Sequence, residues 1–260
     1  MTRFENNHRR DGSMMRSGNP FLKENSFAAE GFHDSRDQMS LEGVANKTLM
    51  LLGLCVVVSF LSWTTMLTNP GLGYILFFVG LLGSLAAVIA MVFLDKKYAV
   101  YIAPVYAVLE GLFLGPLSGM FELIYPGIII QAISLTFGIF LIMLVIYRLR
   151  IIKPTKNLAI GLSAAIGAIM LIYVVSFLLA MFSPFQIPYI HGNGIIGIGF
   201  SLVVIGVAAL TFVFDFDFIE NGVDRGAPKH LEWYAAFGLM VTLIWLYIEI
   251  LRLLSKLRSR

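Results

Sequence analysis

Seven apolar runs follow a polar segment at the start of the chain, and each run is long enough to cross a bilayer as a helix. The polar segment, residues 1–43, is rich in Asn, Arg, Ser and acids, which is typical of a disordered tail. The apolar runs predict helices over residues 45–67, 74–94, 98–121, 127–147, 157–182, 194–218 and 232–254. The expected fold is an all-α membrane protein, with a cytoplasmic tail at residues 1–43 and one multi-pass domain at residues 44–260.

Small residues recur at helical spacing within these runs and predict close helix packing. Gly111, Gly115 and Gly119 fall on one stripe, four residues apart. Gly161 and Ala165 have the same spacing two runs later, as do Ser163 and Gly167. Because small-residue faces let helix backbones approach closely in lipid, we expect a tight bundle.

Composition supports a membrane protein and argues against several other classes. Apolar residues make up 58% of the chain and charged residues 13%, and the mean hydropathy is +0.83. Cys55 is the single cysteine, which rules out an internal disulfide. The net charge of +3 does not indicate a nucleic-acid partner, because the basic residues gather in the tail and at helix ends.

The loops differ in charge, and this predicts topology. Three connections, residues 68–73, 122–127 and 183–193, contain no Lys or Arg. The basic residues of the membrane domain fall on the other side, and the positive-inside rule therefore places the N-terminus in the cytoplasm; they are Lys47, Lys96, Lys97, Arg148, Arg150, Lys153, Lys156, Arg225 and Lys229. The C-terminal tail is the exception. Either its basic residues are tolerated outside, or the last segment does not cross fully.

Four acids lie within or at the ends of apolar runs, where a charge is costly and a functional role is the first hypothesis. Asp215 and Asp217 are about 200° apart around a helix, so one faces the bundle or both mark the interface. Glu249 either works at a site or pairs with Arg252, three residues on. Glu110 lies beside the glycine stripe, and its alternative role is a hydrogen bond between helices.

Asp215 and Glu249 would suit an ion path if they met. A hard cation such as calcium needs several oxygen ligands, and a few carboxylates in a narrow path would bind it weakly enough to release it. Two carboxylates in contact also share a proton and titrate as a pair. The difficulty is geometric: Glu249 is 17 residues beyond Glu232, about 25 Å along a straight helix. The acids meet only if the last helix begins well inside the cytoplasm or bends near Gly238.

Catalytic chemistry is not indicated. An intramembrane aspartyl protease would need Gly-x-Gly-Asp in its second catalytic helix, and this chain has Tyr247-Ile-Glu249 there. A Ser–His protease would need a histidine within a helix, whereas His191 falls in a loop. We expect no enzymatic activity and no cofactor.

Three motifs occur in a particular order along the helices: Glu110-Gly-Leu-Phe-Leu-Gly-Pro116, Phe214-Asp-Phe-Asp-Phe-Ile219 and Leu246-Tyr-Ile-Glu-Ile-Leu251. With them, residues 45–254 resemble the Bax inhibitor-1 family, also called the transmembrane Bax inhibitor motif family. Ser17-Gly-Asn-Pro-Phe21 looks like a feature of its bacterial branch.

The resemblance implies a bundle of seven helices with the last one central, and a pH-sensitive calcium leak. It also implies a carboxylate pair from the sixth and seventh helices. Matching the motifs puts the first carboxylate on Asp215 and the second on Glu249, where the family usually has Asp. The longer link between these helices is another departure. The family's arginine latch from an early helix has no counterpart here.

The leading hypothesis is therefore a pH-sensitive calcium or cation leak in the bacterial plasma membrane. Asp215 and Glu249 would form its ion path and pH sensor and bind calcium weakly, with Asp217 and Glu110 secondary. The alternative is a non-transporting regulator, which would bind a membrane-anchored protease or a stress-response partner through residues 1–43 or a small-residue face. A proton-coupled transporter is a third option. We expect a monomer that contacts lipid, protons and calcium.

Overall fold

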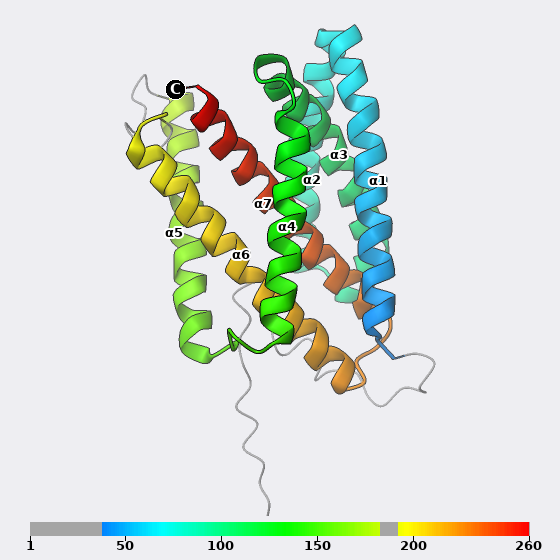
Figure 1. Ribbon diagram of the computed structural model, residues 1–260. Coiled ribbons are helices and arrows are strands. Elements are labelled where there is room, and N and C mark those ends of the chain that lie inside the picture. Colours follow the sequence, from blue (N-terminus) through cyan, green and yellow to red (C-terminus); the bar gives the residue numbers. More distant parts are fainter. Residues whose placement is uncertain (1–37, 183–191, 260) are drawn as a thin grey trace, which may run out of the picture.

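The computed structural model describes residues 38–182 and 192–259, and within them it contains seven long helices (Figure 1). A short 3-10 helix, η3 (Lys96–Tyr98), precedes α3. The seven helices, in chain order, are α1 (Leu41–Thr68), α2 (Pro70–Phe93), α3 (Ala99–Ile124), α4 (Ile128–Arg148), α5 (Lys156–Phe182), α6 (Ile195–Asp224) and α7 (Leu231–Arg258).

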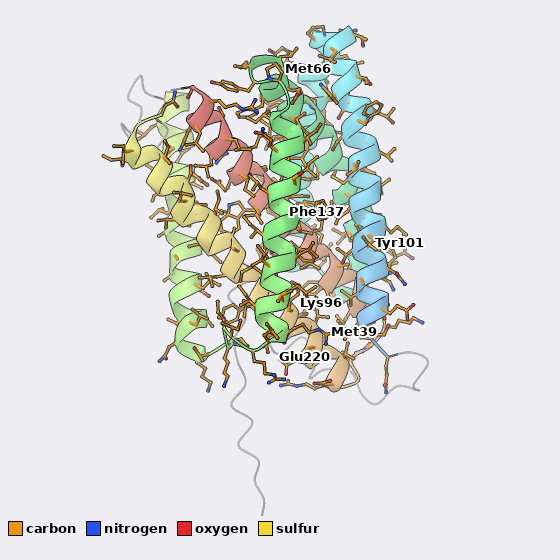
Figure 2. All side chains as sticks on the ribbon, in the orientation of Figure 1. Met39, Met66, Lys96, Tyr101, Phe137 and Glu220 are labelled. Atoms are coloured by element: carbon orange, nitrogen blue, oxygen red, sulfur yellow. The ribbon has the colours of Figure 1, made fainter. Side chains whose placement is uncertain are left out.

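All seven are long and apolar enough to cross a membrane, which confirms the predicted all-α multi-pass fold. The shortest of them has 21 residues, about 30 Å at 1.5 Å per residue. Their outer faces carry large apolar side chains that suit contact with lipid tails. Tyr101 is 72% exposed, and Figure 2 shows it on the outside of the bundle.

Polar caps set the ends of α1, which begins and ends close to polar side chains. The Ser40 hydroxyl accepts the Gly43 N–H at 2.9 Å, so α1 begins inside the last residues of the predicted tail. The remainder of that tail, residues 1–37, lies outside the described residues. At the other end, the connection expected at residues 68–73 consists of Asn69 alone. The Asn69 N–H donates to Thr65 O at 2.8 Å, and the Asn69 side chain accepts the Leu72 N–H at 3.2 Å.

α7 is the central helix, as the family resemblance implies. In its most apolar stretch 61% of the residues are buried, against 17–44% in the other six helices. It contacts α1, α3, α4 and α6, while α5 packs along α6. In Figure 1 α7 slants through the bundle behind α4, and α1 to α3 lie on one side of it.

Glycine packing confirms the predicted close approach in α3 but not in α5. A Cβ on Gly111 or Gly115 would run into the backbone of α1, and one on Gly80 into the backbone of α3. By contrast, a Cβ on Gly161 or Gly167 would find no described atom within 4 Å. The expectation that the small residues of α5 pack inside this bundle is therefore wrong for Gly161 and Gly167, which point away from the other described helices.

The two ends of the bundle differ in charge. We call the end that carries residues 94–98, 149–155 and 225–230 the basic end, and the opposite end the far end. Figure 2 shows Lys96, Glu220 and Met39 at the basic end and Met66 at the far end. α7 is one continuous helix between the two ends and does not stop at Gly238. Its last turn reaches the α3–α4 turn, where Arg258 donates to Pro126 O at 2.8 Å and to Gln131 Oε1 at 2.9 Å. The last segment therefore reaches from one end of the bundle to the other, and the alternative that it does not cross fully is wrong.

Candidate functional site

Asp215 lies inside the bundle, at the contact of α6 with α7. Its side chain is 0% exposed, and its Oδ2 accepts the Thr242 hydroxyl at 2.7 Å. That hydroxyl also lies 3.2 Å from Gly238 O. Asp215 is nine residues before the end of α6 at Asp224, about 14 Å along the helix, and buried phenylalanines stand beside it in sequence. This acid is thus held at membrane depth by a threonine of the central helix.

Asp217 points elsewhere, into a pocket of about 450 Å³ between α6 and the α4–α5 link. We call this the basic-end pocket. Three acids of one α6 face, Asp217, Glu220 and Asp224, lie along it, because spacings of three and seven residues return to the same side of a helix. Arg148, Arg150 and Lys153 line the pocket as well. Tyr147 donates its hydroxyl proton to Glu220.

Glu249 lies toward the far end of α7 and is 1% exposed. Its Oε1 accepts the Tyr173 hydroxyl of α5 at 2.7 Å and Arg252 Nη1–H at 3.0 Å. The ion pair with Arg252, one of the two roles open to Glu249 from its sequence, is therefore present. Glu249 lines a pocket of about 210 Å³, which we call the far-end pocket.

Asp215 of α6 and Glu249 of α7 lie at different depths along the α7 axis and do not meet as a pair. Thr242, which holds Asp215, and Glu249 are seven residues apart, so they share one face of α7 about 10 Å apart along its axis. The physical reason is the difficulty seen in the sequence: α7 begins at Leu231 and stays straight enough to carry Glu249 past the level of Asp215.

Glu110 is buried too, at 5% exposure, but it belongs to a different part of the bundle. It lies within hydrogen-bonding reach of Ser84 in α2 and of Tyr106 in its own helix. Ser84 belongs to the α2–α3 packing, and Tyr106 also contacts the ring of Phe237 in α7, with ring centroids 4.8 Å apart. This arrangement matches the hydrogen bond between helices that was the alternative reading of Glu110.

Two important residues were missed. Glu232 is 0% exposed and accepts from Ser40 N–H at 2.9 Å, from the Ser40 hydroxyl at 3.1 Å and from Lys47. It thereby ties α1 to α7. Tyr173 is the second. Its one usable signal was a phenol within an apolar run, whose hydroxyl needs a partner.

The polar groups together form a broken line along α6 and α7. The basic-end pocket lies at one end, Asp215 with Thr242 in the middle, and the far-end pocket with Glu249 at the other end. Among the described residues no cluster of three or more His, Cys, Asp or Glu side chains could hold a metal ion. The arrangement offers single carboxylates at successive depths, which suits brief contacts with a passing cation better than tight binding.

Comparison with known proteins bears on the family. A family model described as "Bax inhibitor 1 like" matches residues 19–259. A search of curated proteins found no match to the chain. The family resemblance is thus confirmed over nearly all of the membrane domain, while assignment to the bacterial branch stays a prediction.

Proposed function

The chain belongs to the Bax inhibitor 1 like family, and from this premise we propose that it is a pH-sensitive leak for cations, calcium among them, in the bacterial plasma membrane. The observation that carries the proposal is the burial of Asp215 at membrane depth between two polar pockets. A fully buried carboxylate is costly unless it has a role that offsets its desolvation.

The proposed path follows the line of acids. A cation from the cytoplasm enters the basic-end pocket beside Asp217 and Glu220, passes Asp215 and Thr242, and leaves by the far-end pocket beside Glu249. Each step exchanges one carboxylate for the next, so no step needs a deep binding site. We assign the narrowest part of this path to the Asp215–Thr242 contact, whose hydrogen bond of 2.7 Å must open for an ion to pass.

The proposed pH sensitivity resides in Asp215. Its carboxylate attracts a cation only when it is deprotonated, and it accepts the Thr242 hydrogen bond in the described arrangement. Gain of a proton changes both the charge at the narrowest part and the bond that joins α6 to α7. Because the other carboxylates of the path line pockets, we assign the pH dependence to this one.

The test is calcium uptake into liposomes that contain the purified protein, measured with an enclosed dye over a range of pH. The unmodified protein should show uptake above protein-free liposomes, with a rate that depends on pH. Asp215→Asn should abolish that dependence. The matched control is Asp95→Asn, because Asp95 is an exposed acid that pairs with Lys97 at 3.2 Å outside the path. A pH profile unchanged by Asp215→Asn would remove Asp215 from the mechanism.

A second function is favoured by the outer face of α5. Gly161, on one stripe with Ala165, presents small-residue surface with no described atom near its Cβ position, and such surface lets a further membrane helix pack closely. We therefore retain a regulatory role in which a membrane-anchored protease or a stress-response protein binds this face. Gly161→Leu should then prevent co-purification of the partner and leave calcium uptake intact, whereas loss of uptake alone would count against this role.

A further inference from the structure

The far-end pocket places a buried carboxylate beside two cationic side chains. It is lined by residues of α3, α5, α6 and α7, and its charged members are Glu249, Arg252 and Lys256. We propose that this pocket binds a small zwitterion, with its ammonium group on Glu249 and its oxyanion on Arg252. The proposal goes beyond a cation leak, because it concerns a bound ligand and not the transported ion.

Glu249 has one oxygen left for a ligand. Both of its described hydrogen bonds, from Tyr173 and Arg252, end on Oε1. No described hydrogen bond ends on Oε2, and Glu249 lines the pocket. A carboxylate with only 2% of its side chain exposed gains from a donor at that oxygen, and an ammonium group supplies a charged one.

Arg252 has donors to spare on the same side. A guanidinium carries five N–H donors, and the bond to Glu249 uses one of them, on Nη1. Its carbon lies 5.0 Å from the centre of the Tyr173 ring, a cation–π contact, and 44% of the side chain stays exposed. The planar fork of a guanidinium matches the two oxygens of a phosphate or carboxylate.

Lys256 adds positive charge at the pocket rim. Its Nζ donates to Gly197 O and to Ser201 Oγ, both at 2.9 Å, so it also holds the start of α6 against α7. The charges of Glu249, Arg252 and Lys256 sum to one net positive charge. An oxyanion that binds Arg252 therefore experiences the attraction of a second cation one turn further along α7.

Simpler ligands fit less well. A calcium ion needs six to eight oxygens, and a single carboxylate lines this pocket beside two cations. An anion without an ammonium group would lie beside the negative charge of Glu249, which repels it. A zwitterion satisfies both signs, and its carbon atoms can contact the rings of Phe121 and Phe200, which also line the pocket. The ammonium–oxyanion chemistry is shared by two sources: the phosphoethanolamine head group of a lipid, and a soluble zwitterion.

The experiment measures binding to the full chain purified in detergent, by isothermal calorimetry. The three probes are glycerophosphoethanolamine, which carries both charges, and its two halves, glycerol phosphate and ethanolamine. We expect the zwitterion to bind at least tenfold more tightly than either half. Glu249→Gln and Arg252→Lys should each weaken it about tenfold or more, since the first removes the charge for ammonium and the second removes the guanidinium fork. Arg258→Gln, outside the pocket, should leave binding unchanged.

A second arm separates the two sources. Native mass spectrometry compares retention of phosphatidylethanolamine with phosphatidylglycerol of identical acyl chains. Preferential retention of the ethanolamine lipid, lost in Arg252→Lys, assigns the site to a lipid head group. Equal retention of both lipids, together with calorimetric binding of the soluble probe, assigns it to a soluble zwitterion. Binding of either half as tight as the whole, or full binding by both pocket variants, would overturn the proposal whatever the outcome of calcium uptake.

Discussion

The two sides of the central helix are built differently. On one side, α1, α2 and α3 pack so closely that a Cβ on Gly80, Gly111 or Gly115 would collide with a neighbouring backbone. On the other side, Gly161 of α5 and Gly206 of α6 have no described atom within 4 Å of their Cβ positions. These two helices contact α7 through its acids and theirs: Thr242 donates to Asp215 of α6, and Tyr173 of α5 donates to Glu249. The first side is a frame in which backbones touch, and the second joins α7 through buried side chains and polar contacts.

This difference indicates where conformational change is easiest. Helices whose backbones touch have two discrete options, to stay packed or to separate, whereas a pair joined through side chains can shift by small side-chain movements. The hydrogen bond between Thr242 and Asp215 crosses the α6–α7 contact, so it lies where such a shift would act.

The largest effect is expected at the ion pair that joins the frame to the central helix. Glu232→Ala removes the acceptor of Lys47 and of Ser40, and Lys47 is left partly buried. Removing one partner of a buried pair typically costs about 3–5 kcal/mol. Thermal unfolding in detergent should therefore show a large loss of stability. A change within error would mean that α1 is held to α7 by apolar packing alone.

A matched pair of glycine substitutions tests the comparison itself. Gly115→Ala should destabilise the protein by about 1–3 kcal/mol, because its new methyl group meets Ser59 O and Ser62 Oγ of α1. Gly161→Ala should be neutral or stabilising by up to about 1 kcal/mol, because its methyl group enters open space and alanine favours a helix. The two unfolding midpoints, measured side by side, check this. Equal shifts would contradict the contrast between the two sides.

A smaller loss of stability, with a change in transport, is expected at the α6–α7 contact. Thr242→Val keeps the shape of the side chain but removes the hydroxyl that donates to Asp215, for a loss of about 1–3 kcal/mol. The pH profile of calcium uptake should move as well. Ser118→Ala is the control, since it removes a hydroxyl that bonds Tyr247 on another face of α7. A stability loss with an unmoved pH profile would make the threonine purely structural.

The smallest effect is expected at the basic-end pocket. Tyr147→Phe removes the hydroxyl that donates to Glu220 at a half-exposed site, which should cost about 0.5–1.5 kcal/mol. The unfolding midpoint is the measurement, and the expected change in calcium uptake is slight because the acids of the pocket remain. A strong loss of uptake would show that the position of Glu220, and not Asp215, limits passage.

Hydrophobic patterning was sufficient for the number, order and approximate limits of the helices, because each membrane span is encoded locally by about 20 apolar residues. It was not sufficient for the partners of the acids. Glu232 bonds Ser40 and Lys47, 192 and 185 residues away in the chain, and no local pattern encodes such distant contacts. The small-residue face of α5 shows a related limit, because spacing reveals a face suited to packing but not the helix that packs on it.

The central claim is that Asp215 and Thr242 form the narrowest part of a cation path. The most direct measurement is block of calcium uptake by cadmium, a divalent cation that thiolates bind, in a protein that carries Thr242→Cys in a Cys55→Ala background. Removal of Cys55 leaves the introduced thiol as the only one in the chain. The account predicts that cadmium stops uptake in this variant and leaves uptake by Cys55→Ala alone unaffected. Unimpeded calcium uptake by a variant that binds cadmium would contradict it.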